Sequence, residues 1–370
     1  MRIFPLVVSC LLVMAAVACS DTSPAAGTDA KPIIADLTGK VIVPTLQRID
    51  LSAGEMAAAV SALSDSPSEQ TLSAAQAAWR NARVSWRLAD AFRFGPVENL
   101  RITAAVDYAP ANTATIEKNI EGTDALSDTS FENYGANAKG FLAIEYLIFD
   151  NAGNAAVLSK LVGTGVPERR RQYLQLAAAN VKKKTAMLLE AWTAGDKPFS
   201  RELAEAGGAG TVFPSAKSVV DQLVNSSTFA AEVLANTTIG KPFGKKSGGV
   251  PMPDEEVTRR SDHSLDEMTA TLVGVVDIYG GMSQLKEVGL GISDLVVAKN
   301  PALDTRVSTA LADAIIKLRD VPPPFRTAIV SNKDAVEAAY QSVRAAKNMM
   351  STEVAGLLGT TLKFNDNDGD

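Results

Sequence analysis

Histidine and cysteine are the scarcest side chains in this 370-residue sequence, which contains one histidine and two cysteines. A zinc site usually takes three or four ligands, mostly from these two residue types, and a disulfide scaffold needs cysteines spread along the chain. The composition therefore excludes both classes of protein. A Ser-His-Asp or Cys-His catalytic arrangement could be built only around His263.

An excess of basic residues is also lacking, because 42 acidic side chains outnumber 36 basic ones and give a formal charge of −6. Proteins that bind the phosphate backbone of nucleic acids carry a basic surface, so nucleic acid is not an expected partner. Hydrophobic residues nevertheless make up 46% of the chain, which is enough for substantial cores. At roughly 100–200 residues per domain, the length accommodates two domains.

Both cysteines lie near the N-terminus, within or directly after an apolar stretch that covers residues 3–18. This stretch is short for a bilayer-spanning helix and has the length of the apolar core of a signal peptide. The ending Val17-Ala18-Cys19 resembles a bacterial lipobox, which predicts that Cys19 becomes the lipidated N-terminus after cleavage. A plain secretory signal is the alternative.

The residues that follow the lipobox predict the location of the protein. Ser20 and Asp21 resemble the sorting pattern of Gram-negative outer-membrane lipoproteins. We therefore expect a signal peptide at 1–18, a lipidated and flexible tether at 19–32, and an outer-membrane lipoprotein that faces the periplasm. The lipid anchor makes the membrane an expected partner.

Hydrophobic periodicity beyond the tether is helical, with apolar residues three and four positions apart. Pro167 suits the first turn of one long helix, and Ser215 and the pair Asn300-Pro301 predict two further helix starts. Another start is predicted by the capping-box sequence Ser264-Leu265-Asp266-Glu267. In total we expect eight helices, near residues 48–64, 69–93, 138–149, 167–192, 215–236, 264–279, 301–317 and 336–357.

Eight helices in two groups of four predict an all-α fold made of two up-and-down four-helix bundles packed side by side. The Gly- and Pro-containing residues 195–214 separate the groups, so we expect an N-terminal bundle at 33–205 and a C-terminal bundle at 206–370. A second Gly- and Lys-rich stretch, residues 240–249, then becomes a long loop of the C-terminal bundle. Such a loop is either functional or a mobile connector.

Glu145 breaks the pattern of an otherwise apolar helix. Its neighbours three and four positions away are all hydrophobic, namely Phe141, Leu142, Ile148 and Phe149. A buried carboxylate needs an arginine, a metal or hydrogen-bond donors opposite it, because an unpaired buried charge costs several kcal/mol. Glu145 is therefore a candidate site residue, and a structural salt bridge is the alternative.

A second anomaly is a stripe of tryptophans and charges on one face of the helix near 69–93. Trp79, Trp86 and Arg93 follow one another at intervals of seven, and Arg83 and Asp90 come four residues after each tryptophan. This stripe should face the interior of a bundle.

Two residues of this region are expected to meet Glu145. Arg93 is the natural cation for it if the two helices pack together, in a bidentate charge-assisted pair. Asp107 follows in a loop after Gly95-Pro96, and this loop could return a second acid to the same place.

Three segments together resemble a bacterial family. They are Trp79-Arg80-Asn81-Ala82-Arg83 with Ala91-Phe92-Arg93-Phe94-Gly95-Pro96, then Val106-Asp107-Tyr108-Ala109-Pro110, and then Gly140-Phe141-Leu142-Ala143-Ile144-Glu145-Tyr146-Leu147. In this order they resemble the imelysin-like family, which includes the insulin-cleaving membrane protease and iron-regulated protein A. The resemblance covers nearly all of the mature chain. It implies two related helical bundles with a site at their interface, in an envelope protein often linked to iron uptake.

The sequence departs from the family's signature, Gly-x-His-x-x-Glu, at one position. Gly140 and Glu145 match it, but Leu142 stands where the family has histidine. Histidine and glutamate three residues apart on a helix can share a metal ion, and leucine cannot coordinate one. The departure argues against the peptidase activity that the family name implies, and against a metal at this point.

The lone histidine begins the second half of the expected site. His263 follows Arg260 and Ser261 closely and precedes a helix N-terminus, which favours anions over imidazolium. An exposed or capping histidine is one interpretation. The other, which the resemblance supports, places Arg260, Ser261 and His263 against Glu145, Arg93 and Asp107 across the interface.

The sequence thus leads to a binding module with a polar pocket between the bundles, centred on Glu145 and linked to iron or metal acquisition. Its ligand-binding candidates are Glu145, Arg93, Asp107, Arg260, Ser261, His263, Asp90 and Gly140. We expect no resident cofactor, with iron or another divalent metal as the candidate if one is bound. Expected partners are the membrane and an unknown small ligand, metal or envelope protein. The alternatives are a metallopeptidase that uses other residues in place of the missing histidine, and a purely structural envelope spacer.

Overall fold

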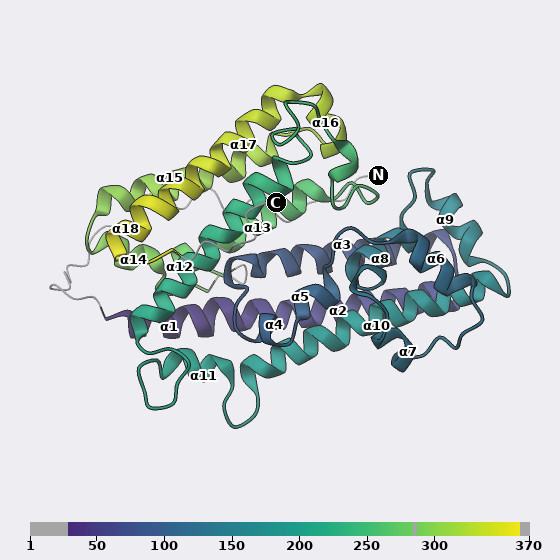
Figure 1. Ribbon diagram of the computed structural model, residues 1–370, viewed down its shortest axis with the longest axis horizontal. Coiled ribbons are helices and arrows are strands. Elements are labelled where there is room, and N and C mark those ends of the chain that lie inside the picture. Colours follow the sequence, from purple (N-terminus) through teal and green to yellow (C-terminus); the bar gives the residue numbers. More distant parts are fainter. Residues whose placement is uncertain (1–28, 284–286, 363–370) are drawn as a thin grey trace.

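The computed structural model describes residues 29–283 and 287–362 (Figure 1). Cys19 and the predicted signal peptide lie outside these ranges. Within them the chain forms helices and no strand, so the prediction of an all-α fold is confirmed. No helix in the described part is both long enough and apolar enough to cross a membrane.

The first helix starts much earlier than its periodicity predicts. It runs without a break through α1 (Ala30–Asp36), the π-helical segment η1 (Leu37–Ile42) and α2 (Val43–Asp65). The Asp29 carboxylate caps it by accepting a hydrogen bond from the Lys31 N–H at 3.0 Å. The predicted tether at 19–32 is therefore wrong over its last three residues, which are helical because α1 buries an apolar face on the rest of the protein.

The N-terminal half has three long helices, α2, α3 and α10, and several short elements. In chain order, the elements after α2 are α3 (Glu69–Leu88), η2 (Ala89–Phe92), α4 (Pro96–Asn99), α5 (Ile102–Val106), α6 (Thr113–Glu121), α7 (Asp128–Glu132), η3 (Ala136–Ala138), α8 (Gly140–Ile148), α9 (Asn154–Leu161), α10 (Val166–Thr193) and α11 (Phe199–Ala204). The sequence predicted α8 near 138–149 but missed the other short helices, because so few residues hold too little hydrophobic periodicity.

The C-terminal half contains four long helices, α12, α13, α15 and α17. Its elements are α12 (Ala216–Val233), η4 (Leu234–Ile239), η5 (Pro253–Glu255), α13 (Ser264–Gly280), α14 (Ile292–Val297), α15 (Pro301–Arg319), α16 (Phe325–Ser331), α17 (Lys333–Asn348), η6 (Met349–Val354) and α18 (Ala355–Leu358). Ser215 and Asn300 cap α12 and α15 as predicted.

One predicted cap is wrong. His263 occupies the N-cap position of α13, and its side chain accepts no capping hydrogen bond. Ser264 lies inside the helix, where its hydroxyl contacts the Thr258 hydroxyl at 2.9 Å. The capping box predicts that the Glu267 carboxylate accepts a hydrogen bond from a main-chain N–H at the helix start. It binds the Arg83 guanidinium of the other half instead, because a charged donor forms a stronger hydrogen bond than a main-chain N–H.

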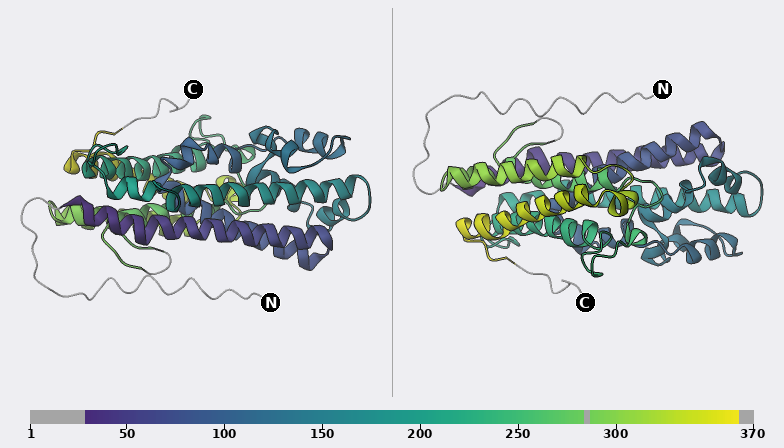
Figure 2. Two further views of the ribbon diagram at one scale, coloured as in Figure 1. Left: turned by 90° about the horizontal axis from the view of Figure 1, so that it is seen from below. Right: turned by 90° about the horizontal axis from the view of Figure 1, so that it is seen from above.

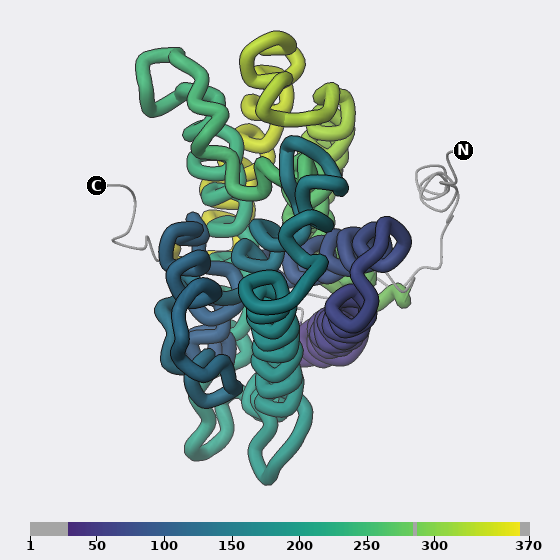
Figure 3. Tube along the Cα trace, turned by 90° about the vertical axis from the view of Figure 1, so that its right-hand side faces the viewer, coloured from purple at the N-terminus to yellow at the C-terminus, as the bar shows by residue number. Residues whose placement is uncertain are grey.

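The two halves meet along α3 and α13. Seen from below, the purple α2 lies beside the teal α10 in the N-terminal half (Figure 2). The end-on view shows the green and yellow helices of the C-terminal half above the purple, blue and teal helices of the N-terminal half (Figure 3). Helix α3 contacts α2 of its own half and α13 of the other half. A Cβ atom at Gly274 would lie 2.1 Å from the Leu88 carbonyl oxygen, so only glycine permits the observed approach of α13 to the end of α3. The polar side chains of both helices therefore face each other at short range.

Candidate functional site

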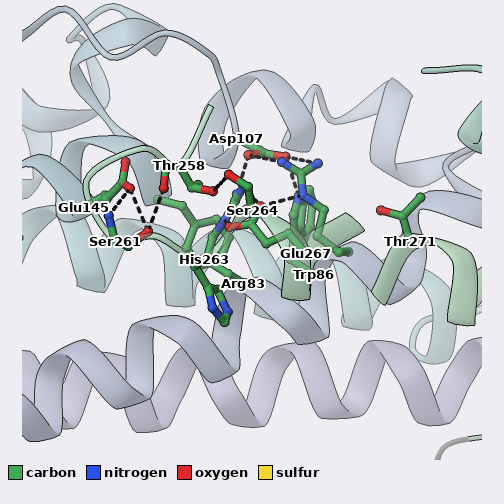
Figure 4. Close-up of polar contacts among 12 residues, drawn as sticks. Arg83, Trp86, Asp107, Glu145, Thr258, Ser261, His263, Ser264, Glu267 and Thr271 are labelled. Carbon is green, nitrogen blue, oxygen red and sulfur yellow. Dashed lines mark hydrogen bonds and ion pairs between the residues drawn. The ribbon is translucent and has the colours of Figure 1, made fainter. Parts of the chain in front are cut away.

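Glu145 is held by the loop that precedes α13 (Figure 4). Its Oε1 accepts hydrogen bonds from the Ser261 hydroxyl at 2.8 Å, the Ser261 N–H at 3.0 Å and the Arg260 N–H at 3.2 Å. Its side chain comes from α8, whose first residue, Gly140, has φ of +73°. A Cβ atom there would lie 2.3 Å from the Val106 carbonyl oxygen, so Gly140 allows α8 to begin against the segment that carries Asp107.

The predicted burial of Glu145 agrees with the structure, in which the residue is 1% exposed. Burial raises the pKa of its carboxyl group to about 7, although the hydrogen bonds from Ser261 oppose this shift. The negative charge of Glu267 raises the pKa further, and the Arg83 guanidinium lowers it. Both protonation states of Glu145 are therefore populated near neutral pH.

The expected ion pair between Arg93 and Glu145 is wrong. The Arg93 guanidinium pairs with Asp90 and lies 3.5 Å from the Asp107 carboxylate. Arg93 follows the last turn of η2, where its own helix supplies Asp90 three residues earlier, whereas Glu145 finds uncharged donors in the loop at 260–261. The structure brings Arg260 and Ser261 to Glu145 as predicted, through main-chain N–H groups and the serine hydroxyl.

A second and larger cluster is centred on Arg83, which is 0% exposed. Its guanidinium donates to both oxygens of Glu267, with a 3.0 Å bond to Oε1, and to the Asp107 carboxylate. Trp86 donates its indole N–H to Asp107 at 2.9 Å, and the Arg87 guanidinium lies 3.0 Å from both carboxylates. Side chains from α3, α13 and the end of α5 thus form one buried network across the two halves (Figure 4).

This network keeps its two acids ionised. Burial alone would raise the pKa of Asp107, but the guanidinium groups of Arg83, Arg87 and Arg93 hold that pKa far below its usual range. Burial likewise opposes ionisation of Glu267, and Arg83 and Arg87 again lower the pKa. Two carboxylates and three guanidinium groups therefore form a fixed, charged arrangement at neutral pH.

Asp90 and Arg93 extend the cluster toward solvent. Asp90 accepts a hydrogen bond from the Thr271 hydroxyl at 2.7 Å, which joins η2 to α13. The Arg93 guanidinium stacks on the Trp86 ring, with 4.8 Å between its central carbon and the ring centroid. Burial lowers the pKa of Arg93, although Asp90 and Asp107 oppose this effect.

His263 does not join either cluster, although it was expected to face Glu145. Its Nδ1 lies 3.0 Å from the Asp266 carboxylate, and its Nε2 lies 3.3 Å from the Arg80 carbonyl oxygen. The ring also packs near Trp79, at 6.2 Å between centroids. The side chain at the α13 N-terminus is thus buried in a contact between the halves, away from the candidate acids.

A cavity of about 510 Å³ opens beside the Arg83 cluster. Its polar side is formed by Arg87, Asp90, Arg93, Glu267 and Thr271, among others. Its apolar side is formed by Val97, Phe229, Ala230, Val233, Leu234, Val257 and Met268. We call it the inter-half cavity. The sequence placed Glu145 at the centre of a pocket between the bundles, but Glu145 does not line this cavity.

The surroundings of Glu145 do not fit a metal ion. One of its oxygens accepts three hydrogen bonds, and the buried Leu142, at the position of the family's histidine, has no atom that could ligate. Across residues 29–283 and 287–362, no three His, Cys, Asp or Glu side chains are placed to hold a metal. A general base must also reach its substrate, and Glu145 is enclosed in this structure.

Sequence reasoning missed the side chains that connect the two halves. Arg83 was recognised as part of the buried stripe, but its role as the centre of the network was not. Glu267 was read as a capping residue, and Arg87 and Thr271 were not singled out. One feature of the sequence could have indicated them. Ser264, Glu267 and Thr271 are spaced three and four residues apart, so their polar side chains share one side of α13 beside its apolar face.

The sequence of residues 42–350 matches the imelysin family. The chain belongs to this family. The resemblance noted in its motifs is thereby confirmed, and this imelysin carries leucine at the position of the signature histidine. No functionally curated protein matches the sequence.

Two solved structures share the fold of this imelysin. One is described as a candidate iron-regulated protein A precursor from Parabacteroides distasonis, with a TM-score of 0.76 and 18% identity over 89% of this chain and 95% of that one. The other is an imelysin-like protein from Psychrobacter arcticum, with a TM-score of 0.69 and 14% identity over 90% of this chain and 97% of that one. At these identities the likeness establishes the fold and leaves the activity to be argued from the site.

Proposed function

We propose that this imelysin is a binding module of the bacterial cell envelope, anchored by lipid at Cys19 and engaged in iron acquisition. In this proposal the ligand occupies the inter-half cavity. The volume of about 510 Å³ lies in the range of small-molecule sites, which combine apolar walls with a few placed polar groups. The cavity has this composition, with an apolar side on α12 and a charged side on α3 and η2.

One observation carries the proposal. The Nε–H group of Arg93 is buried and has no hydrogen-bond partner within the described residues, and its residue lines the inter-half cavity. Buried donors of this kind are almost always satisfied in folded proteins, because an unmet donor costs about 1–3 kcal/mol. A ligand with an acceptor oxygen would satisfy it, while its apolar part would cover the half-exposed Phe229 and Val233.

The proposed connection with iron rests on the family and on the name of the Parabacteroides distasonis protein. The residues at the site favour an organic ligand over a bare metal ion, since the cavity offers an arginine donor and apolar walls. An oxygen-rich molecule that carries iron would combine both properties.

The alternative function is an imelysin-type metallopeptidase, which one observation favours. The pKa of Glu145, raised by burial to about 7, would suit a general acid or base. Peptide cleavage by the purified protein, stimulated by zinc or iron and abolished in Glu145→Gln, would establish this alternative and displace the binding module.

Native mass spectrometry of the protein isolated from iron-limited cells tests the binding function. We expect an organic molecule that is released on denaturation, retained in Arg201→Gln and lost in Arg93→Gln. Arg201 is a suitable control because it is exposed and, within the described residues, forms an ion pair with Glu205 of its own turn alone. Protein free of any small molecule, or equal retention in Arg93→Gln, would refute the proposal.

Membrane attachment is tested separately. Cys19→Ser removes the proposed acylation site, so the variant should remain unprocessed or leave the membrane fraction in soluble form. Membrane fractionation and the mass of the mature N-terminus provide the readout. A variant that fractionates and is processed like the wild type would show that the lipobox was misread.

A further inference from the structure

The loop that holds Glu145 also lines a second cavity. This cavity has a volume of about 370 Å³ and shares no lining residue with the inter-half cavity. Three of its six lining residues are arginines, and the full set is Asn151, Pro253, Asp254, Arg259, Arg260 and Arg326. Such a concentration of guanidinium groups around one cavity is unexpected in a protein with a net charge of −6.

Two of the three arginines pair with neighbouring side chains. Arg326, from α16, binds the Asp262 carboxylate at 2.9 Å and the Asn151 side-chain oxygen at 3.1 Å. Arg259 binds the Asp254 carboxylate at 3.0 Å. Asp254 is almost fully exposed, so its pairing with Arg259 is screened and contributes little.

The third arginine leaves a positive charge uncompensated. Within the described residues, the Arg260 guanidinium has no hydrogen bond and no ion pair, and lies 5.1 Å from the centroid of the Tyr146 ring. The nearby carboxylate of Asp150 already pairs with Lys160 at 2.8 Å. Among the described residues, Arg259 and Arg326 therefore each have a partner carboxylate, and Arg260 has none.

The backbone around Arg260 is fixed before any ligand arrives. The N–H groups of Arg260 and Ser261 donate hydrogen bonds to Glu145, so this segment is attached to α8. The Arg259 carbonyl accepts a hydrogen bond from the Arg326 guanidinium, which attaches the same segment to α16. A guanidinium on such a segment loses less conformational entropy on binding than one on a free loop.

We propose that Arg259, Arg260 and Arg326 form a binding site for a phosphate group. Guanidinium groups match phosphate oxygens with paired N–H donors. The three arginines come from two elements, since Arg259 and Arg260 are adjacent in the loop before α13 and Arg326 lies in α16. The phosphate belongs either to a soluble molecule or to a lipid headgroup. The site is independent of the ligand in the inter-half cavity.

Isothermal titration of the purified protein with sodium phosphate tests the site. We expect saturable binding that weakens as NaCl is raised from 25 to 250 mM, because the attraction is electrostatic and the site is open to solvent. Arg260→Met should weaken binding at least about tenfold, since it removes the uncompensated charge and keeps the apolar stem over Tyr146. The variant should fold normally, because the Arg260 guanidinium makes no hydrogen bond within the described residues.

A matched control variant tests whether the loss of phosphate binding is specific to Arg260. Arg201→Met removes an exposed arginine elsewhere and should leave phosphate affinity unchanged. The source of the phosphate is tested with vesicles of phosphatidylcholine, with and without phosphatidylglycerol. If the wild-type protein binds only the vesicles with phosphatidylglycerol, and Arg260→Met binds neither kind, the phosphate belongs to a lipid headgroup. Phosphate binding without vesicle retention would assign a soluble ligand. Absence of binding to both probes, or equal binding by Arg260→Met, would overturn the proposal.

Discussion

Glu145 and Arg83 show two opposite solutions to the burial of charge. Glu145 receives neutral donors, and burial raises its pKa to about 7. Arg83 stays ionised between two carboxylates that are themselves nearly inaccessible. The difference follows from the partners, because a hydroxyl and two N–H groups compensate a charge less well than an opposite charge does.

The raised pKa of Glu145 predicts a pH dependence of stability. Its pKa is about 7 in the folded protein and ordinarily 4.5, so the folded state binds more protons between these values. The free energy of unfolding contributed by Glu145 therefore falls as pH rises through this window. Relative to the wild type, Glu145→Gln should gain up to about 3 kcal/mol between pH 4.5 and pH 8, measured by urea unfolding.

A matched variant isolates this effect from the other acids. Glu121→Gln changes the same residue type at an exposed position on α6 and should show no comparable change with pH. If the difference between Glu145→Gln and the wild type stays constant from pH 4 to pH 8, the carboxyl group does not titrate as described.

Loss of Arg83 should be among the most damaging substitutions in the chain. Arg83→Met leaves Asp107 and Glu267 buried with only Arg87 and Arg93 near them, so we expect a loss of about 3–5 kcal/mol in unfolding free energy. Adding Asp107→Asn removes one stranded charge and should recover part of that loss. Strictly additive effects in this double-mutant cycle would contradict a shared network.

Sequence reasoning can recognise that a residue is buried more readily than it can name the partner. The apolar neighbours of Glu145 on α8 predict its burial. Its actual partner, Ser261, is 116 residues away along the chain, and an arginine on a nearby helix was the simpler expectation. Arg93 pairs instead with Asp90, which lies three residues before it on the same segment.

At the scale of the elements, the crossing of α3 and α13 decides which side chains can meet. Gly274 lets α13 approach the Leu88 carbonyl, and this approach places Glu267 beside Arg83. The sequence predicts both helices from their periodicity. It does not predict that they cross, because a single glycine within a helix has no distinctive periodic pattern.

Gly274→Ala should separate α13 from α3. The added Cβ atom would meet backbone that cannot move aside, so we expect a loss of about 1–3 kcal/mol in unfolding free energy. Gly356→Ala is the control, since nothing lies within 4 Å of its Cβ position in α18 and alanine favours helix. Thermal and urea unfolding of both variants provide the comparison. Equal stability of the two would mean that the helices do not approach as closely as described.

The early start of the first helix has a similar local cause. Pro44 cannot donate a hydrogen bond to the preceding turn, and a proline inside a helix usually breaks or kinks it. Here the π-helical segment η1 ends two residues before Pro44, and the helix continues through it. The sequence prediction began the helix after this proline, because such a rearrangement of the hydrogen bonds leaves no periodic signal.

At the scale of the whole molecule, the two halves share their most polar interior. Arg83 and Asp107 come from one half and Glu267 from the other, while α1 at the start of the chain packs on α12 and α14. The boundary at 205/206 therefore separates two groups of helices whose buried charges depend on one another.

We predict that neither half folds by itself. Residues 29–205 and 206–370, expressed separately, should lack cooperative unfolding transitions, because each would expose apolar surface and part of the charge network. Expressed together, they should associate and restore a cooperative transition, which near-ultraviolet circular dichroism can follow. Independent cooperative folding of both fragments would instead show that the halves are autonomous domains.

The position of α1 determines how the molecule would stand on a membrane. Helix α1 lies at one end of the long axis and α9 at the other (Figure 1). Under the proposed anchoring, Asp29 lies ten positions after the acylated Cys19, and a fully extended chain spans at most about 3.3–3.6 Å per residue. The tether thus reaches no farther than about 35 Å. The α1 end is kept close to the bilayer, and the α9 end is free to swing outward toward partners.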